Sequence, residues 1–231
     1  MGCEFITPAI PDSIKALRCA QYRNIFEFPL ENPNLFGTET LCGDWGGDLL
    51  VVAKDFAPAA LIERRREEGD PFPYRHEPAF PTNKLLVKLL CDNGRNVSIA
   101  GAGNTSCGAL YMSACFFLRS DGRTSAALPN RKECMDKSRE VFQFTIASMG
   151  RLKKIACLGD FAFDFVTDYF GRPAKWRECL EARKPISADR YLVYALSHTG
   201  SRGRRNRLHN ATDEQRMTAI QEDWTSMLSD H

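Results

Sequence analysis

Residues 48–58 read Asp-Leu-Leu-Val-Val-Ala-Lys-Asp-Phe-Ala-Pro, and this stretch decides the fold. Four consecutive aliphatic residues between polar ones are typical of a strand that is buried on both faces, as in parallel sheets covered by helices. Ligands of such sheets bind outside the carboxyl ends of the strands. Because Lys54 and Asp55 stand at that end, we expect a functional site there; the alternative is a solvated turn.

The rest of the chain alternates strands with helices. Short apolar runs predict three more strands, at 110–118, 153–158 and 191–197. Helices are predicted at 12–22, 59–68, 82–92, 132–149, 160–170 and 212–228. Alternation of this kind favours parallel strands joined by right-handed crossovers. We therefore expect an α/β fold, a three-layer α/β/α sandwich with a central, mainly parallel four-stranded sheet.

Length and composition favour one soluble domain. The 231 residues are expected to form a single domain over 1–231, active as a monomer. The net charge of +2 leaves only locally clustered charge for a nucleic-acid partner. Nine cysteines form no CxxC pair and are expected to be reduced thiols, mostly packed in the interior. With no apolar run of membrane-spanning length and no amino-terminal signal pattern, we expect no membrane partner and a cytoplasmic location, nucleoid-associated in a bacterium.

A second chemical stretch follows the last predicted strand. His198 stands at the same sheet edge as Asp55, and Thr-Gly-Ser leads from it into an arginine-rich segment that begins after Ser201. The arginines of this segment are Arg202, Arg204, Arg205 and Arg207. Because a guanidinium group can donate two hydrogen bonds to one phosphate, these arginines predict a phosphate-binding loop, and Ser201 and the arginines are the candidates for DNA contact if the phosphates belong to a nucleic acid. The alternative is a solvated basic loop beside a structural histidine.

A glycine-rich run at 100–108, Ala-Gly-Ala-Gly-Asn-Thr-Ser-Cys-Gly, keeps other functions open. Ser106 occupies the position of the third glycine of the GxGxxG dinucleotide fingerprint, so the match is incomplete. A Rossmann-like nucleotide-binding enzyme would hold phosphates at this run. A non-catalytic nucleic-acid-binding module would instead use the arginine-rich segment alone. A zinc deaminase is disfavoured because the His76-Glu77 pair lacks a Pro-Cys-x-x-Cys partner.

From residue 48 to residue 207, the order and spacing of these stretches resemble the uracil-DNA glycosylase superfamily. Residues 51–58 are similar to its first motif, an apolar strand that ends in Gly-Gln-Asp-Pro-Tyr-His or a shorter variant. Residues 196–201, Leu-Ser-His-Thr-Gly-Ser, stand where the superfamily has a strand followed by His-Pro-Ser-Pro. Residues 155–162, Ile-Ala-Cys-Leu-Gly-Asp-Phe-Ala, resemble its third strand, which ends in glycine and enters a helix.

The resemblance implies a DNA repair enzyme that flips uracil out of DNA and hydrolyses its N-glycosidic bond, leaving an abasic site. It implies that Asp55 orients a water molecule and stabilises the positively charged sugar, while His198 donates a hydrogen bond to the departing base. The residues expected to contact the base are Lys54, Phe56, Ala57, Phe72, Phe80, Asn104 and Ser113.

Several positions depart from the superfamily pattern. Ala57 replaces the tyrosine that blocks the thymine methyl group in the best-known branch. The predicted second strand lacks the asparagine that recognises uracil, which leaves Ser113, Asn104 or a backbone group for that role. Arg202 lies where the superfamily inserts an apolar side chain into the base stack, so its guanidinium group is expected to fill that space. Cys3 and Cys19 are too far apart for the iron–sulfur branch, and no cofactor is expected.

Overall fold

The computed structural model describes residues 7–19, 22–28, 40–55, 58–71, 73, 80–97, 108–120 and 131–230. Its strands are β1 (Tyr22–Arg23), β2 (Cys42–Gly43), β3 (Leu49–Asp55), β4 (Ala109–Cys115), β5 (Leu118–Arg119), β6 (Lys154–Leu158), β7 (Ile186–Ala188) and β8 (Tyr191–Leu196). Its α-helices are α1 (Asp12–Lys15), α2 (Ala59–Glu67), α3 (Pro81–Asp92), α4 (Arg131–Ser148), α5 (Asp160–Tyr169), α6 (Trp176–Ala182), α7 (Ser201–Arg207) and α8 (Asp213–Ser229). One 3-10 turn, η1, covers Ile25–Glu27.

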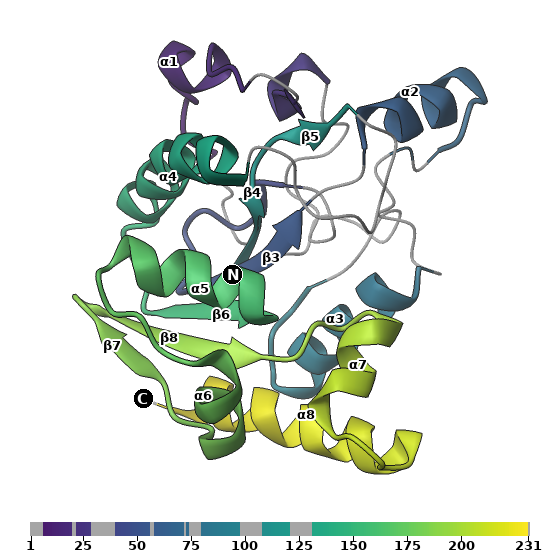
Figure 1. Cartoon of the computed structure of the whole chain (residues 1–231), viewed down its shortest axis with the longest axis vertical. Helices are drawn as coiled ribbons and strands as arrows, with labels where there is room; N and C mark the ends of the chain where they lie inside the picture. The colour runs from purple at the N-terminus through teal and green to yellow at the C-terminus, as the bar shows by residue number, and fades with distance from the viewer. Residues whose placement is uncertain are drawn as a thin grey trace.

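A six-stranded sheet in the order β2-β4-β3-β6-β8-β7 forms the centre of the molecule (Figure 1). The four inner strands are parallel, and the two edge strands run antiparallel to their neighbours. The predicted α/β sandwich and its four parallel strands are therefore confirmed. The structure adds the edge strands β2 and β7, which are too short to give a clear sequence pattern, and a separate ribbon of β1 and β5.

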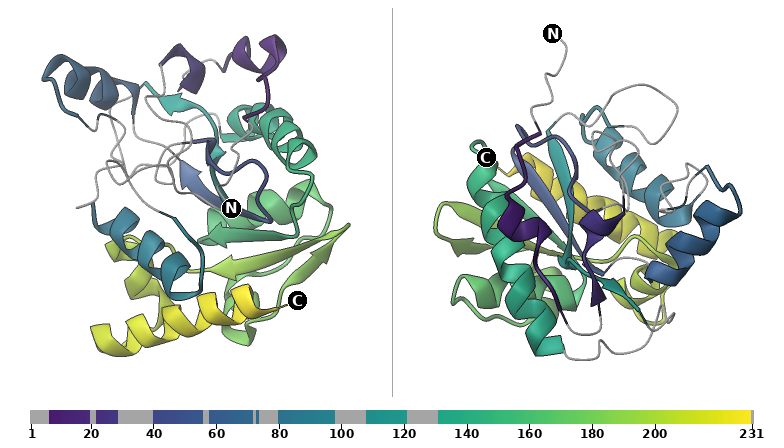
Figure 2. Two further views of the ribbon diagram at one scale, coloured as in Figure 1. Left: turned by 180° about the vertical axis from the view of Figure 1, so that it is seen from behind. Right: turned by 90° about the horizontal axis from the view of Figure 1, so that it is seen from above.

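Strand β3 is buried on both faces because its aliphatic side chains alternate between two cores. Leu50 and Val52 belong to the core that includes side chains of α4 and α5. Leu49, Val51 and Ala53 belong to the core that includes side chains of α3 and α8. Figure 2 shows the sheet between these two layers of helices.

The prediction of one helix over 12–22 is wrong, because α1 ends at Lys15 and Tyr22 lies in β1. The side chain of Asn24 explains this early end. It is buried, and its amide nitrogen donates to the carbonyl oxygens of Ile14 and Leu17, at 2.9 and 3.2 Å. Carbonyls at the end of a helix need such partners, and a buried side chain that supplies them fixes where the helix stops.

The other predicted helices are confirmed, with boundaries within about two residues. Helix α8 begins at a capping box, in which the Thr212 hydroxyl accepts from the Gln215 N–H and the Gln215 side chain accepts from the Thr212 N–H. The predicted strand at 110–118 ends earlier than expected, because β4 stops at Cys115 and β5 belongs to the separate ribbon. Helices α6 and α7 were not predicted.

Most of the described cysteines are packed thiols, as the sequence predicts. The buried free cysteines are Cys19, Cys42, Cys115, Cys134 and Cys157. Cys91 is exposed and Cys179 is half-buried. Within the described part of the chain, no helix combines the length and the apolar character needed to cross a membrane.

Candidate functional site

A cavity of about 810 Å³ opens at the carboxyl ends of β3, β6 and β8. Lys54 contributes from the end of β3, Gly159 from the turn after β6, and His198 from the turn after β8; side chains of α3, α5, α6 and α7 also line the wall. Because β4 lies on one side of β3 and β6 on the other, the chain reverses direction across the sheet between β3 and β6. This is the position at which open α/β sheets bind ligands.

His198 lines the cavity, and a hydrogen bond from the backbone determines which of its ring nitrogens can donate. The Gly200 N–H donates to His198 Nδ1 over 2.9 Å, so a neutral ring carries its hydrogen on Nε2. Burial lowers the pKa of His198 below its ordinary value, which favours the neutral ring. His198 is therefore a neutral hydrogen-bond donor at neutral pH, suited to a ligand atom that gains negative charge.

Helix α7 packs so tightly on His198 that Gly203 has no room for a side chain. A Cβ atom at Gly203 would lie 2.5 Å from His198 Cβ and 2.7 Å from the His198 carbonyl carbon. Gly200 is also confined, since its Cβ would lie 3.0 Å from His198 Nδ1 and 3.2 Å from Thr82 Oγ1. Glycine at these positions lets α7 and α3 approach the histidine closely.

We expect Gly203→Ala to displace α7 and lower the free energy of unfolding by about 1 to 3 kcal/mol, because the new methyl group overlaps the His198 backbone. Any reaction that uses His198 should slow as well. Gly150→Ala is the matched control, since a Cβ atom there meets nothing within 4 Å. Chemical denaturation of both variants checks the prediction, and equal stability of the two would show that α7 is not held against His198.

Asp55, at the end of β3, is a carboxylate without a hydrogen-bond donor in the described part of the chain. Its side chain is only 17% exposed, and its nearest cation is Lys54, with Nζ 3.9 Å from Asp55 Oδ2. That Oδ2 atom is buried and accepts no hydrogen bond there. Burial raises the pKa of the Asp55 carboxyl, although the charges of Lys54 and Arg119 oppose the rise. Such an arrangement costs stability and is typical of functional sites.

Asp55 and His198 do not contact each other, because strand β6 separates β3 from β8. Two strand spacings place the ends of β3 and β8 about 10 Å apart. Lys54 and His198 line the same cavity, whereas Asp55 is not among the residues of its wall. The sheet therefore brings the two catalytic candidates to one edge, with space between them that a ligand can occupy.

The cavity wall carries more positive than negative charge. Of the described residues, Lys54, Arg177, Arg202 and Arg205 line it, against the one carboxylate of Asp160. Ser201 also lines it. Two half-buried aromatic side chains, Phe161 and Trp176, complete this wall. The composition fits a ligand that combines phosphate groups with flat rings.

The arginine-rich segment is a helix rather than the predicted loop, and this divides its arginines into two sets. Arg202 and Arg205 are exposed and line the cavity. Arg204 is half-buried and does not line it. Arg207 is only 6% exposed, and its Nε and Nη2 atoms donate to the Asp223 carboxylate at 2.6 and 2.9 Å. The assignment of Arg207 to DNA phosphates is therefore corrected, because this guanidinium group is already used inside the fold.

Two of the residues predicted to contact the base lie away from the cavity wall. Ser113 is fully buried in β4, and its hydroxyl accepts a hydrogen bond from the Thr40 hydroxyl over 3.1 Å. Strand β4 lies on the far side of β3 from β6, so the role of Ser113 in reading the base edge is corrected. Phe80 precedes α3 and does not line the cavity, although Thr82 does.

Four other predicted contact residues lie outside the described residues. They are Phe56, Ala57, Phe72 and Asn104. Most of the glycine-rich run lies outside as well, except Gly108, whose N–H donates to Asp44 Oδ2 over 2.6 Å. That N–H group is already engaged within the fold and cannot also hold a phosphate.

Three residues that line the cavity were not predicted from the sequence: Phe161, Trp176 and Arg177. Phe161 stands inside the stretch that resembles the third superfamily strand and its helix, so its position was available as a signal. Trp176 and Arg177 lie in α6, which has no counterpart among the motifs considered. Only the fold brings α6 next to β8, where the Trp176 Nε1–H donates to the Leu196 carbonyl over 3.3 Å.

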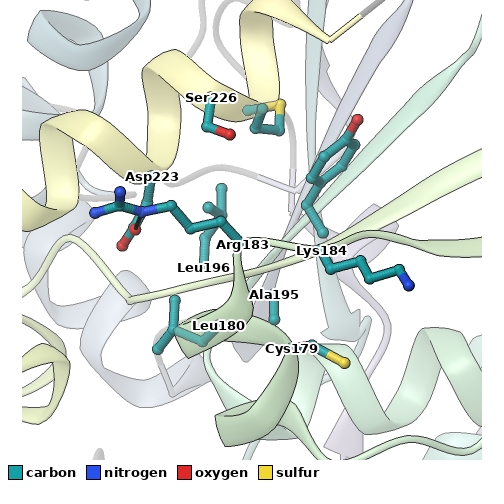
Figure 3. Close-up of a pocket in the computed structure, with 10 residues that line it drawn as sticks. Cys179, Leu180, Arg183, Lys184, Ala195, Leu196, Asp223 and Ser226 are labelled. Atoms are coloured by element: carbon teal, nitrogen blue, oxygen red, sulfur yellow. Dashed lines mark hydrogen bonds and ion pairs between the residues drawn. The ribbon is translucent and has the colours of Figure 1, made fainter.

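A second cavity, about 10 Å³, lies between α6, β8 and α8 and has room for about one water molecule. Figure 3 shows Arg183 extending from the end of α6 towards Asp223 of α8, with Ser226 and Leu196 nearby. The Arg183 Nε donates to Asp223 Oδ1 over 2.9 Å. Because this space is small and Arg183 and Asp223 pair with each other there, it is part of the interior rather than a ligand site.

Comparison of the chain with models of known protein families gives no match, and comparison with curated proteins gives none either. The described residues contain no cluster of three or more His, Cys, Asp or Glu side chains that could hold a metal ion. The functional conclusion therefore depends on the geometry of the site and on the resemblance of its motifs.

Proposed function

We propose that the protein is a DNA glycosylase that binds an extruded uracil in the cavity at the ends of β3, β6 and β8 and hydrolyses its N-glycosidic bond. The observation that supports this best is the state of His198, a neutral ring whose Nδ1 accepts from Gly200 and whose Nε2–H remains to donate. A departing pyrimidine gains negative charge on its exocyclic oxygen, and a neutral donor stabilises that charge without giving up its proton.

Asp55 acts on the sugar side of the same bond. As the bond between the sugar C1′ and the base nitrogen breaks, its electron pair leaves with the base and the sugar becomes positively charged. The ionised Asp55 carboxylate stabilises this charge and orients a water molecule, whose oxygen bonds to C1′. The proton released by the water neutralises the base. Lys54, which lines the cavity, holds the neighbouring phosphate.

The aromatic and cationic side chains of the wall account for binding. Phe161 offers a ring for stacking on a flipped base, with the Lys54 ammonium 5.8 Å from its centroid. Arg202 and Arg205 are exposed on the face of α7 that lines the cavity, where DNA phosphates can reach them.

The test is an abasic-site assay on an oligonucleotide containing one uracil, with the same sequence containing thymine as a control. We expect strand cleavage by alkali only after incubation of the uracil substrate with the protein. Tight binding of the oligonucleotide without abasic sites would support a non-catalytic nucleic-acid-binding module instead. Binding of a free mononucleotide or NAD without DNA would support a Rossmann-like nucleotide enzyme.

His198→Ala is expected to cost about 2 to 4 kcal/mol of transition-state stabilisation, a 30- to 1000-fold slower release of uracil. DNA affinity should change little, because the hydrogen bond strengthens only as charge develops on the base. Single-turnover rates and binding isotherms for the same oligonucleotide check this. Loss of the folded state in His198→Ala, seen by circular dichroism, would instead favour a structural histidine.

Arg202→Met and Arg205→Met are each expected to weaken DNA binding and to reduce the slope of log affinity against log salt by about 0.9 on duplex or 0.7 on single strands, if each contacts one phosphate. The matched control is Arg204→Met, because Arg204 belongs to the same helix but does not line the cavity. Binding titrations over a range of salt concentrations measure the slopes. Identical slopes for all three variants would refute the proposed division of the arginines.

A further inference from the structure

Trp176 is the one tryptophan of the chain that lies at the cavity. The chain has three tryptophans, and the other two, Trp45 and Trp224, are 3% and 0% exposed. Trp176 is half-buried at the start of α6, where it lines the cavity. The hydrogen bond from its Nε1 to the Leu196 carbonyl holds the ring at the end of β8. A large aromatic ring held in this way at an open cavity is a stacking platform for another flat ring.

Arg177 makes this platform cationic and links it to helix α7. Its guanidinium carbon lies 5.4 Å from the centroid of the Trp176 ring. Its Nη1 donates to the Asn206 carbonyl over 3.0 Å, and its Nη2 lies 3.3 Å from His209 Nε2. Arg177, Arg205 and Asn206 all line the cavity, so this part of the wall combines an aromatic ring with two guanidinium groups and an amide, which are donors suited to phosphate.

The Trp176 ring and the Phe161 ring are presented by different helices and lie near different cations. Phe161 comes from α5 and has the Lys54 ammonium near its ring, whereas Trp176 comes from α6 and has Arg177 near its ring. Among the described residues, the cavity wall therefore has two pairs of an aromatic ring and a cation. Its volume of about 810 Å³ lies in the upper part of the range for small-ligand sites, which leaves space for more than one base.

We propose that Trp176 and Arg177 form a second nucleotide subsite, which stacks a base next to the excised one and binds its phosphate, and that the preferred substrate is therefore an unpaired DNA strand. This inference extends the proposed glycosylase function, on which its assignment to a neighbour of the excised base depends. In a duplex, the neighbouring base stays paired within its own stack and cannot reach the Trp176 ring. In a single strand both bases are free to turn towards the protein, and rings with nearby arginines are the usual means of holding such strands.

The test measures the binding of a uracil-free single-stranded oligothymidylate through intrinsic tryptophan fluorescence, with no base release involved. Because Trp45 and Trp224 are buried, Trp176 is the residue whose emission a stacked base is expected to quench. We expect quenching on addition of the single strand and little on addition of a blunt hairpin duplex. Trp176→Leu should abolish the quenching and weaken binding of the single strand about 5- to 150-fold, whereas Trp176→Phe should keep binding within about threefold of the wild type.

Each outcome separates the subsite from the glycosylase. Quenching by the single strand in a protein that releases no uracil would leave the subsite intact and overturn the proposed reaction. Uracil release with no quenching, and with single-strand affinity unchanged in Trp176→Leu, would overturn the subsite alone. Equal quenching by single strand and duplex would overturn the preference for unpaired DNA. Equal weakening by Trp176→Phe and Trp176→Leu would show that the indole supports the fold rather than a base.

Discussion

Asp55→Asn is expected to lower the rate of uracil release by about a thousandfold or more while DNA binding stays close to that of the wild type. The change keeps the shape of the side chain but removes the negative charge that stabilises the positively charged sugar, and such electrostatic stabilisation is often the largest contribution to catalysis. Single-turnover release from a uracil-containing oligonucleotide measures the effect. Release at close to the wild-type rate would exclude Asp55 from the reaction.

The same substitution is expected to stabilise the fold at neutral pH. Because burial raises the folded-state pKa of Asp55, the unfolded chain ionises first as the pH rises, and the native state loses stability from about pH 4 upwards. Asparagine removes this loss, so Asp55→Asn should unfold at higher denaturant concentration than the wild type at pH 7. The advantage should disappear at a pH below the ordinary pKa of aspartate.

Asp48, just before the start of β3, is the matched control, because its pKa is shifted in the opposite direction to that of Asp55. Burial alone would raise the pKa of Asp48, but its ion pair with Arg95 outweighs this and lowers the pKa, so its charge stabilises the native state above the ordinary aspartate pKa. Asp48→Asn should therefore lose stability at neutral pH, and this difference should shrink as the pH falls through the folded-state pKa. Destabilisation of similar size in both variants would show that the charge of the Asp55 carboxylate does not destabilise the native state.

The main strands of the sheet were predicted well from the sequence, because the apolar pattern that marks each strand is local. An apolar run between polar residues, as at 48–58, marks a buried parallel strand without knowledge of its neighbours. Alternation with helices predicts parallel strands, so the carboxyl ends that carry Lys54 and His198 are expected at one edge of the sheet. The order of the strands, with β3 between β4 and β6, was supplied by the structure.

Contacts between distant segments could not be predicted in this way. Residues 201–207, Ser-Arg-Gly-Arg-Arg-Asn-Arg, contain one glycine and four arginines and give no apolar face, so nothing local marks α7 as a helix. The helix instead depends on Gly203, which meets the His198 backbone, and on Arg207, which reaches Asp223 of α8. Trp176 is likewise recognisable as a cavity residue only after α6 is placed against β8.

Asp223→Asn is expected to lower the free energy of unfolding by about 3 to 5 kcal/mol, because it leaves the Arg207 charge buried and uncompensated. The Asp223 carboxylate is 3% exposed and accepts hydrogen bonds from Arg207 and from Arg183. The matched control is Glu222→Gln on the same helix. Glu222 pairs with Arg183 at the surface, where the loss of a salt bridge costs at most about 1 kcal/mol. Chemical denaturation of the two variants measures the difference. Similar losses of stability would show that the buried Arg207–Asp223 pair stabilises the fold no more than the surface pair does.

The buried pair also separates Arg207 from the exposed arginines of α7 that we propose to contact DNA. Replacing both partners, in Arg207→Met with Asp223→Leu, should recover most of the stability lost in Asp223→Asn, since an apolar pair of similar volume can replace a buried ion pair. In that double variant the slope of log affinity against log salt should equal the wild-type slope, because Arg207 contributes no phosphate contact. The exposed Arg202, one helical turn and a half away, should reduce the slope when replaced. A reduced slope in the stable double variant would instead return Arg207 to the DNA-binding surface.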